Sequence, residues 1–76
     1  MLQNQIQITP GVCGGHARIR NTRIPVWTLV AYWKLGVPDE ELLANYPGLT
    51  EFDLSAAWDY YEQNREQVDG AIAQDE

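Results

Sequence analysis

The sequence predicts a mainly α-helical protein, built as a three-helix bundle of the helix-turn-helix type. A short β arm or hairpin precedes the bundle, and a C-terminal helical extension follows it. Three observations lead to this fold class. First, apolar residues recur at helical spacing beyond Pro25. Second, Thr50 and Asp53 have the spacing of a capping box. Third, Pro47-Gly48 separates two short helical segments.

The N-terminal third has the pattern of short strands. Residues Gln5 to Thr9 alternate polar and apolar side chains, which is typical of a half-buried strand, and Pro10-Gly11 ends that strand as a turn. Residues Ala17 to Pro25 are predicted as a tight hairpin. Its strands are Arg18-Ile19-Arg20 and Arg23-Ile24, joined through Asn21-Thr22, because Asn tolerates the left-handed conformation that such a turn can need.

The first helix is predicted over Val26 to Leu35, with Gly36 placed to cap its C-terminus. Apolar side chains surround this short helix almost completely, so it should be buried on more than one side. We expect the second side to contact another chain. The two stripes are Val26, Leu29, Val30 and Trp33, and Trp27, Ala31 and Leu35.

The second helix is predicted to begin with Pro38 at its first position, followed by three acidic residues, and to end at Pro47-Gly48. The third helix has the clearest start, because Leu49 and Leu54 flank the capping box as a hydrophobic staple. Its pattern allows either one helix that continues past Asn64 or a break there into a short final helix. Its apolar stripe is Leu54, Ala57, Trp58, Tyr61, Val68 and Ile72.

Size and composition indicate one core that needs support. A domain of 76 residues buries only about 60% of the surface of its unfolded chain. One cysteine, Cys13, excludes an internal disulfide, and one histidine, His16, leaves too few ligands for structural zinc, so self-association is expected. Residues 1–25 are interpreted as a dimerisation arm and hairpin, and residues 26–76 as the helix-turn-helix domain with its C-terminal helix. The sequence shows no signal peptide or membrane span, which predicts a cytoplasmic protein.

Charge is distributed unevenly along the chain. The net charge is −6, and all eleven acidic residues lie from Asp39 onward, which argues against a broad nucleic-acid footprint. Arg18, Arg20 and Arg23 cluster in the predicted hairpin. They could bind DNA phosphates, or enter the acidic metal site of a nuclease partner, because guanidinium groups bind such anions bidentately. Alternatively, they pair with the protein's own acids.

Two further patterns argue against catalysis and against DNA reading. The run Cys13-Gly14-Gly15-His16 lacks a group to orient a base and a third metal ligand, so it is interpreted as a structural glycine loop. No enzyme activity, metal or cofactor is therefore expected.

The third helix holds the position of a recognition helix, but its carboxylates would repel phosphates. Its expected outer face is Glu51, Ser55, Asp59 and Glu62.

Several short motifs together resemble the domain-of-unknown-function 433 family (DUF433). They are residues 12–26, Gly36 to Glu40, Tyr46 to Thr50, and Tyr60-Tyr61 with Asn64. This resemblance implies a homeodomain-like helix-turn-helix fold with an N-terminal β arm for dimerisation. It also implies a likeness to VapB-type antitoxins of prokaryotes, which are often encoded beside a PIN-like ribonuclease toxin. Two residues depart from the family pattern: Asn21 replaces a usual Gly, and Val37 replaces a usual Ser cap.

The sequence thus predicts a type II antitoxin-like homodimer that neutralises a PIN-like ribonuclease toxin and could repress its own operon. Two alternatives stay open: a stand-alone DNA-binding transcriptional regulator, and a dimeric adaptor that does not bind DNA. The aromatic residues are interpreted as core and interface anchors. The predicted dimer interface is Ile6, Ile8, Ile19, Ile24, Trp27 and Trp33.

Overall fold

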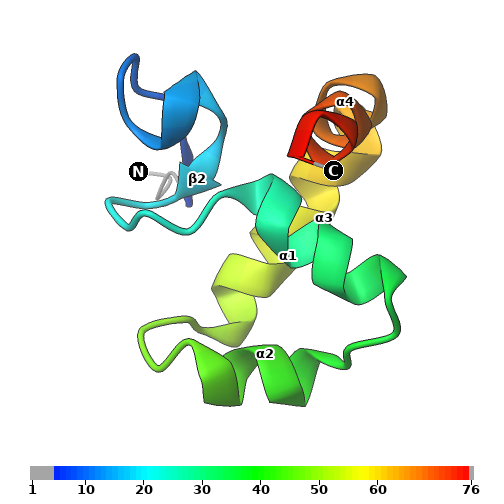
Figure 1. Cartoon of the computed structure of the whole chain (residues 1–76). Helices are drawn as coiled ribbons and strands as arrows, with labels where there is room; N and C mark the ends of the chain where they lie inside the picture. The colour runs from blue at the N-terminus through cyan, green and yellow to red at the C-terminus, as the bar shows by residue number, and fades with distance from the viewer. Residues whose placement is uncertain (1–4, 76) are drawn as a thin grey trace.

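The computed structural model of the chain describes residues 5–75 and is mainly helical, as predicted (Figure 1). Four helices follow a small two-stranded antiparallel sheet, and one 3-10 turn lies between the strands. The elements are β1 (Ile6–Gln7), the 3-10 turn η1 (Cys13–Gly15), β2 (Arg18–Ile19), α1 (Val26–Lys34), α2 (Asp39–Asn45), α3 (Glu51–Gln63) and α4 (Arg65–Asp75). Within residues 5–75, no helix has the length and apolarity needed to cross a membrane. Residues 1–4 of the predicted arm lie outside the described residues.

The sheet is shorter than the sequence predicts, and its pairing differs. β1 and β2 pair with each other, with Ile6 opposite Ile19. The predicted second hairpin strand, Arg23-Ile24, is not a strand, and that part of the prediction is wrong. Only a single bridge joins Arg18 to Pro25, because proline has no N–H to extend the ladder and here it caps the start of α1.

The turn after β2 takes an unexpected backbone conformation. The Thr22 N–H donates to the Ile19 carbonyl at 2.9 Å, so Arg20 and Asn21 are the central residues. Arg20, not Asn21, has the positive φ, at 45°. A left-handed conformation costs a non-glycine residue about 1–2 kcal/mol. Other contacts must therefore hold Arg20 in place.

The helix ends follow sequence signals closely. Gly36, with φ 91°, ends α1 in a Schellman motif, because the Gly36 N–H donates to Trp33 and the Val37 N–H donates to Tyr32. α2 begins one residue later than predicted, since Pro38 is its N-cap and makes no side-chain cap bond.

The capping box at the start of α3 is confirmed. The Asp53 N–H donates to Thr50 Oγ1 at 3.2 Å, and the Thr50 N–H donates to Asp53 Oδ2 at 3.0 Å. The two staple residues, Leu49 and Leu54, are both buried in the core. The local sequence signal and the tertiary packing therefore agree at this helix start.

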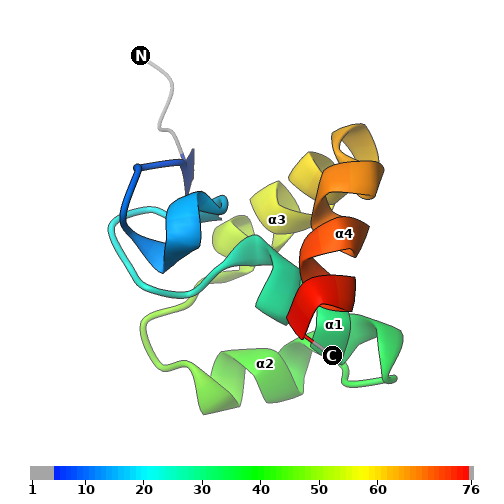
Figure 2. The same ribbon diagram turned by 45° about the horizontal axis from the view of Figure 1, so that its top comes forward.

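The long C-terminal pattern breaks at Asn64, which answers the question that the sequence leaves open. Asn64 leaves the helical region at φ −137°, and its side-chain amide donates to the Tyr60 carbonyl at 2.9 Å. The break turns α4 back so that it packs against α1 and α3 (Figure 2). The core lies between these elements and contains Ala17, Ile19, Val26, Leu29, Val30, Leu42, Leu49, Leu54, Ala57, Tyr61 and Val68.

Candidate functional site

The three hairpin arginines do not share one accessible face. Arg18 is buried, with 8% of its surface exposed. Its Nη1 donates to the Thr22 carbonyl and its Nη2 to Thr9 Oγ1, both at 3.0 Å, while its Nε is buried without a partner. Among the described residues, no carboxylate forms an ion pair with it. Arg18 therefore holds the arm together from inside, and the structure does not place it on the binding face that the sequence predicts.

Arg20 instead binds the protein's own Asp53. Its Nε and Nη2 donate to the two carboxylate oxygens at 2.9 and 2.8 Å, and Nη2 also donates to the Gly48 carbonyl. Gln5 Nε2 and the Thr50 N–H complete four hydrogen bonds to a carboxylate that has no exposed surface. This ion pair is bidentate and joins the arm to the start of α3. It also accounts for the strained backbone at Arg20.

The sequence pattern indicates only a helix-capping role for Asp53. The Arg20 hydrogen bonds lower the pKa of Asp53 from 3.8 to about 2, with help from the Thr50 N–H and hydroxyl and against the effect of burial. An acid at the third position of a helix is a recognisable cap signal. Its pairing with an arginine 33 positions earlier depends on how the arm folds over α3, which no local pattern reports.

The lowered pKa of Asp53 predicts that acid destabilises the fold. Well above pH 3.8 the carboxylate is ionised in both folded and unfolded chains, and its interactions contribute about 2 kcal/mol of stability. As the pH falls from about 4 to about 2, the unfolded chain takes up the proton first, so this contribution is lost. Urea denaturation from pH 5 to pH 2 should show the loss. The Asp53→Asn variant should lack this acid-dependent loss of stability. If the free energy of unfolding fell equally with pH in both proteins, the Asp53 carboxylate would not be the cause.

Arg23 is the exposed member of the hairpin group. It forms no ion pair with any residue of the described part of the chain. The prediction that the arginines pair with the protein's own acids therefore describes Arg20, while Arg23 remains accessible to a partner.

The outer face of α3 is acidic, as predicted. Glu51, Ser55, Asp59 and Glu62 are all exposed. The nearby cation, Arg65, is held by Glu62 at 3.2 Å in an exposed pair. A phosphate backbone that approached this face would meet carboxylates.

An aromatic groove lies between α1 and the α3–α4 corner. The rings of Trp33 and Trp58 lie 5.9 Å apart, and Tyr61 meets Trp33 edge to face at 6.5 Å. Lys34, Glu62 and Arg65 complete a groove of about 410 Å³. The Lys34 ammonium and the Tyr61 hydroxyl bind Asp69, which lowers the pKa of that carboxyl. Half of the Trp33 surface stays exposed, so the aromatic cluster is open to contact.

The residues predicted for the dimer interface have different environments. Ile19 has no exposed surface and belongs to the core of the single chain, so its side chain is not accessible to a partner. Ile6, Ile24 and Trp27 pack partly buried against that core. Ile8 and Trp33 keep 55% and 50% of their surface exposed.

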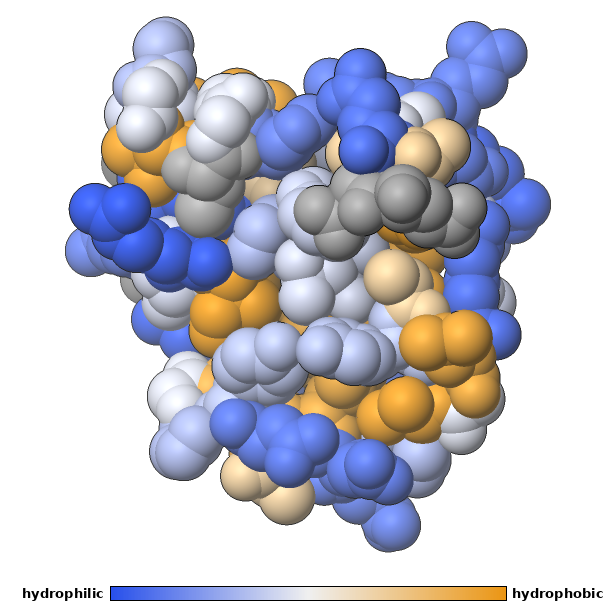
Figure 3. Space-filling model, viewed as in Figure 1, coloured by the Kyte–Doolittle hydropathy of each residue, from blue (hydrophilic) through white to orange (hydrophobic). Residues whose placement is uncertain are grey.

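Apolar surface also gathers at the end of α1. Leu35 is 79% exposed and Tyr32 is 42% exposed. In Figure 3, hydrophobic atoms lie at the right of the molecule, over the end of α1 and the segment that leads to α2, above the hydrophilic surface of α2. Of the predicted second stripe of α1, Leu35 is thus exposed in the single chain, while Trp27 and Ala31 are half-buried.

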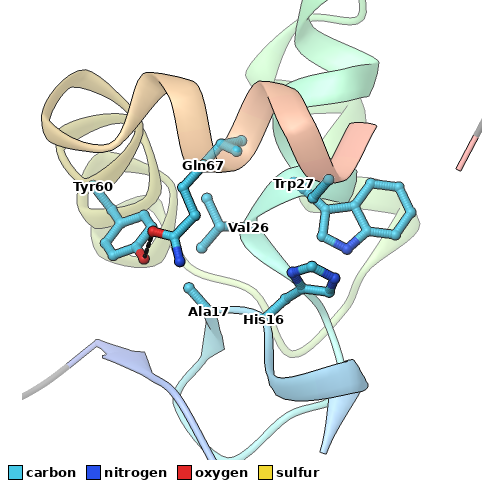
Figure 4. Close-up of a pocket in the computed structure, with 8 residues that line it drawn as sticks. His16, Ala17, Val26, Trp27, Tyr60 and Gln67 are labelled. Carbon is cyan, nitrogen blue, oxygen red and sulfur yellow. Dashed lines mark hydrogen bonds between the residues drawn. The ribbon is translucent and has the colours of Figure 1, made fainter. Parts of the chain in front are cut away.

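The glycine loop lies beside a small hollow between η1, α1 and α4 (Figure 4). The His16 imidazole lies near Trp27 on one side of the hollow, and on the other side the Tyr60 hydroxyl donates to Gln67 Oε1 at 3.1 Å. The hollow holds about 10 Å³, roughly the space of one water molecule. Gly14 and Gly15 have φ values of 64° and 80°, which fits the predicted structural role of the loop. In the part of the chain that the structure describes, no three His, Cys, Asp or Glu side chains gather as a metal site would require.

These features define a small, mainly helical domain with one core, and its surface carries an accessible arginine, an acidic helix face and an aromatic groove. The chain belongs to the DUF433 family, described as proteins of unknown function, which it matches over residues 6–61. It is similar to the crystal structure of a DUF433 member protein from Anabaena variabilis ATCC 29413, with 80% sequence identity and a TM-score of 0.92. The match covers 93% of this chain and 70% of that one. No curated protein matches the sequence.

Proposed function

We propose that the chain is an antitoxin-like regulatory protein that works as a homodimer and neutralises a PIN-like ribonuclease toxin by binding it. The toxin class comes from the family resemblance. The observation that carries the proposal is the acidic outer face of α3, where a helix-turn-helix protein would need cations to bind DNA. A helix-turn-helix domain with such a face is better suited to protein contacts than to a DNA groove.

The distribution of apolar surface supports protein binding. Trp33, Leu35 and Phe52 expose 50%, 79% and 80% of their surface in a small chain. Large exposed aromatic and aliphatic side chains are typical anchors of protein interfaces. A fold of this size also gains stability when a partner covers such groups.

The direct test uses the neighbouring gene. Where a PIN-like open reading frame lies beside this one, the two products should co-purify, and the chain should restore growth to cells that express the toxin. A neighbouring toxin that neither co-purifies nor is neutralised would contradict the proposal.

Arg23 is expected to contribute directly to toxin binding, because it is exposed and forms no ion pair with a described residue. An arginine that enters an acidic site is worth roughly 2 kcal/mol or more at an interface. Arg23→Ala should therefore weaken toxin binding by about thirtyfold or more while leaving thermal unfolding unchanged. Calorimetric titration would measure the affinity, with Asn21→Ala, also exposed on this turn, as the matched control. Unchanged toxin affinity in Arg23→Ala would exclude this role.

A further inference from the structure

A second hollow lies beside the aromatic groove along α3. This hollow of about 470 Å³ lies between the start of α2 and the start of α3. Trp58 lines both spaces, so they are neighbours on one surface. We call the combined surface the α3 groove, and its second half is lined by Asp39, Glu40, Leu43, Glu51, Ser55 and Trp58.

The floor of the α3 groove is one face of one helix. The α3 residues that line it are Glu51, Ser55, Trp58, Tyr61 and Glu62, and Arg65 follows at the start of α4. Intervals of three and four residues place helix side chains on the same face. The end of α1 with Trp33 flanks one end of this face, and the start of α2 flanks the other. The groove can therefore hold an extended or helical segment along α3.

The two ends of the α3 groove differ in charge. At the aromatic end, Lys34 is paired with Asp69 at 2.8 Å and Arg65 with Glu62 at 3.2 Å, so these charges are balanced. At the other end, Asp39, Glu40 and Glu51 are exposed and form no ion pair within residues 5–75. Trp58, at the aromatic end of the groove, thus also lies beside unbalanced negative charge.

We propose that the α3 groove docks a cationic amphipathic segment of a partner protein. An apolar side chain of that segment lies against Trp33 and Trp58, and its Lys or Arg side chains reach the three carboxylates. The inference rests on the proposed function in taking the partner to be a protein. It goes further by assigning the contact to this groove and by giving the chemistry of the bound segment.

The charges disfavour two other occupants. A nucleic acid would bring phosphates to the carboxylates. A second copy of this chain has few cations to offer, because Arg18 is buried and Arg20, Lys34 and Arg65 are in ion pairs. Among the described residues this leaves Arg23, one charge for three acids.

The experiment uses the full chain and a synthetic amphipathic helix of leucine and lysine as the probe. NMR titration of the labelled chain should shift the signals of Leu43, Ser55 and the Trp58 indole. The affinity should fall as salt is raised, because exposed charges are screened. A peptide with glutamate in place of lysine should not bind.

Matched variants separate a local site from general attraction to an acidic protein. The combined variant Asp39→Asn, Glu40→Gln, Glu51→Gln removes three charges in the groove, and the control Glu41→Gln, Asp59→Asn, Glu66→Gln removes three exposed charges outside it. The first should weaken peptide binding by about tenfold and the second by less than about twofold. Ser55→Arg should also block binding, whereas Gln63→Arg, exposed on the same helix, should not.

Several results would overturn the inference. They are equal weakening by both charge variants, peptide-induced shifts confined to other surfaces, and binding of duplex DNA in the groove. A wild-type dimer that Ser55→Arg converts to a monomer would assign the groove to a second copy.

Failure of the docking inference is distinct from failure of the proposed function. A toxin held equally well by the groove variants overturns only the docking surface, and a groove that binds the peptide while no toxin is bound overturns only the antitoxin role.

Discussion

Replacement of Asp53 by alanine is expected to lower the free energy of unfolding by about 3 kcal/mol. Removal of one partner of a buried ion pair costs about 3–5 kcal/mol, because the other charge loses its compensation. Arg20 keeps 37% of its side-chain surface exposed and can regain water, which places the effect at the low end of that range. The variant also loses the acceptors for the Thr50 N–H in the capping box and for Gln5, while the Thr50 side chain still caps α3.

Urea denaturation at pH 7 measures this effect. Asp59→Ala is the control, because Asp59 is exposed on the same helix and should change stability by less than about 0.5 kcal/mol. A 76-residue domain has a total stability of roughly 4–11 kcal/mol, so the Asp53 variant should be visibly less stable. If the two variants unfolded at the same urea concentration, Asp53 would not be the link between the arm and α3.

Replacement of Leu29 by alanine should cost a similar amount, about 2–5 kcal/mol. Leu29 has no exposed surface and lies in the middle of α1, which packs against both α3 and α4. Truncation removes apolar burial and leaves a cavity that the neighbouring helices can close only in part. Thermal or urea denaturation would measure the change in stability.

Leu35 provides the matched control for this prediction. It has the same side chain at the end of the same helix but is 79% exposed, so Leu35→Ala should change stability by less than about 0.5 kcal/mol. The conservative Leu29→Met should cost less than about 1.5 kcal/mol. Equal losses in Leu29→Ala and Leu35→Ala would mean that the centre of the core lies elsewhere.

The charged residues fall into two groups, one that stabilises the fold and one that is exposed to partners. Arg20 and Asp53 are occupied with each other and position the arm. Arg23 and the α3 groove are exposed and available to partners. Substitutions at the first pair should therefore act through stability, and substitutions at the second set through binding.

The sequence by itself determined the features that depend on neighbours along the chain. Gly36 ends α1, Thr50 and Asp53 cap α3, and the exposed acids of α3 follow from helical spacing. Each signal acts within about one helical turn, where backbone hydrogen bonds and side-chain direction depend on local residues. The fold class and the acidic outer face of α3 could be predicted for this reason.

Only the tertiary structure decided how distant charges were used. Arg18, Arg20 and Arg23 look equivalent in a short hairpin, yet one is buried, one is bound to Asp53 and one is exposed. Likewise, Trp33 and Trp58 meet only because α1 packs on α3. These outcomes depend on which surfaces meet when the helices pack and the arm folds back. Periodicity shows which face of an element is apolar, but it does not show what that face will contact.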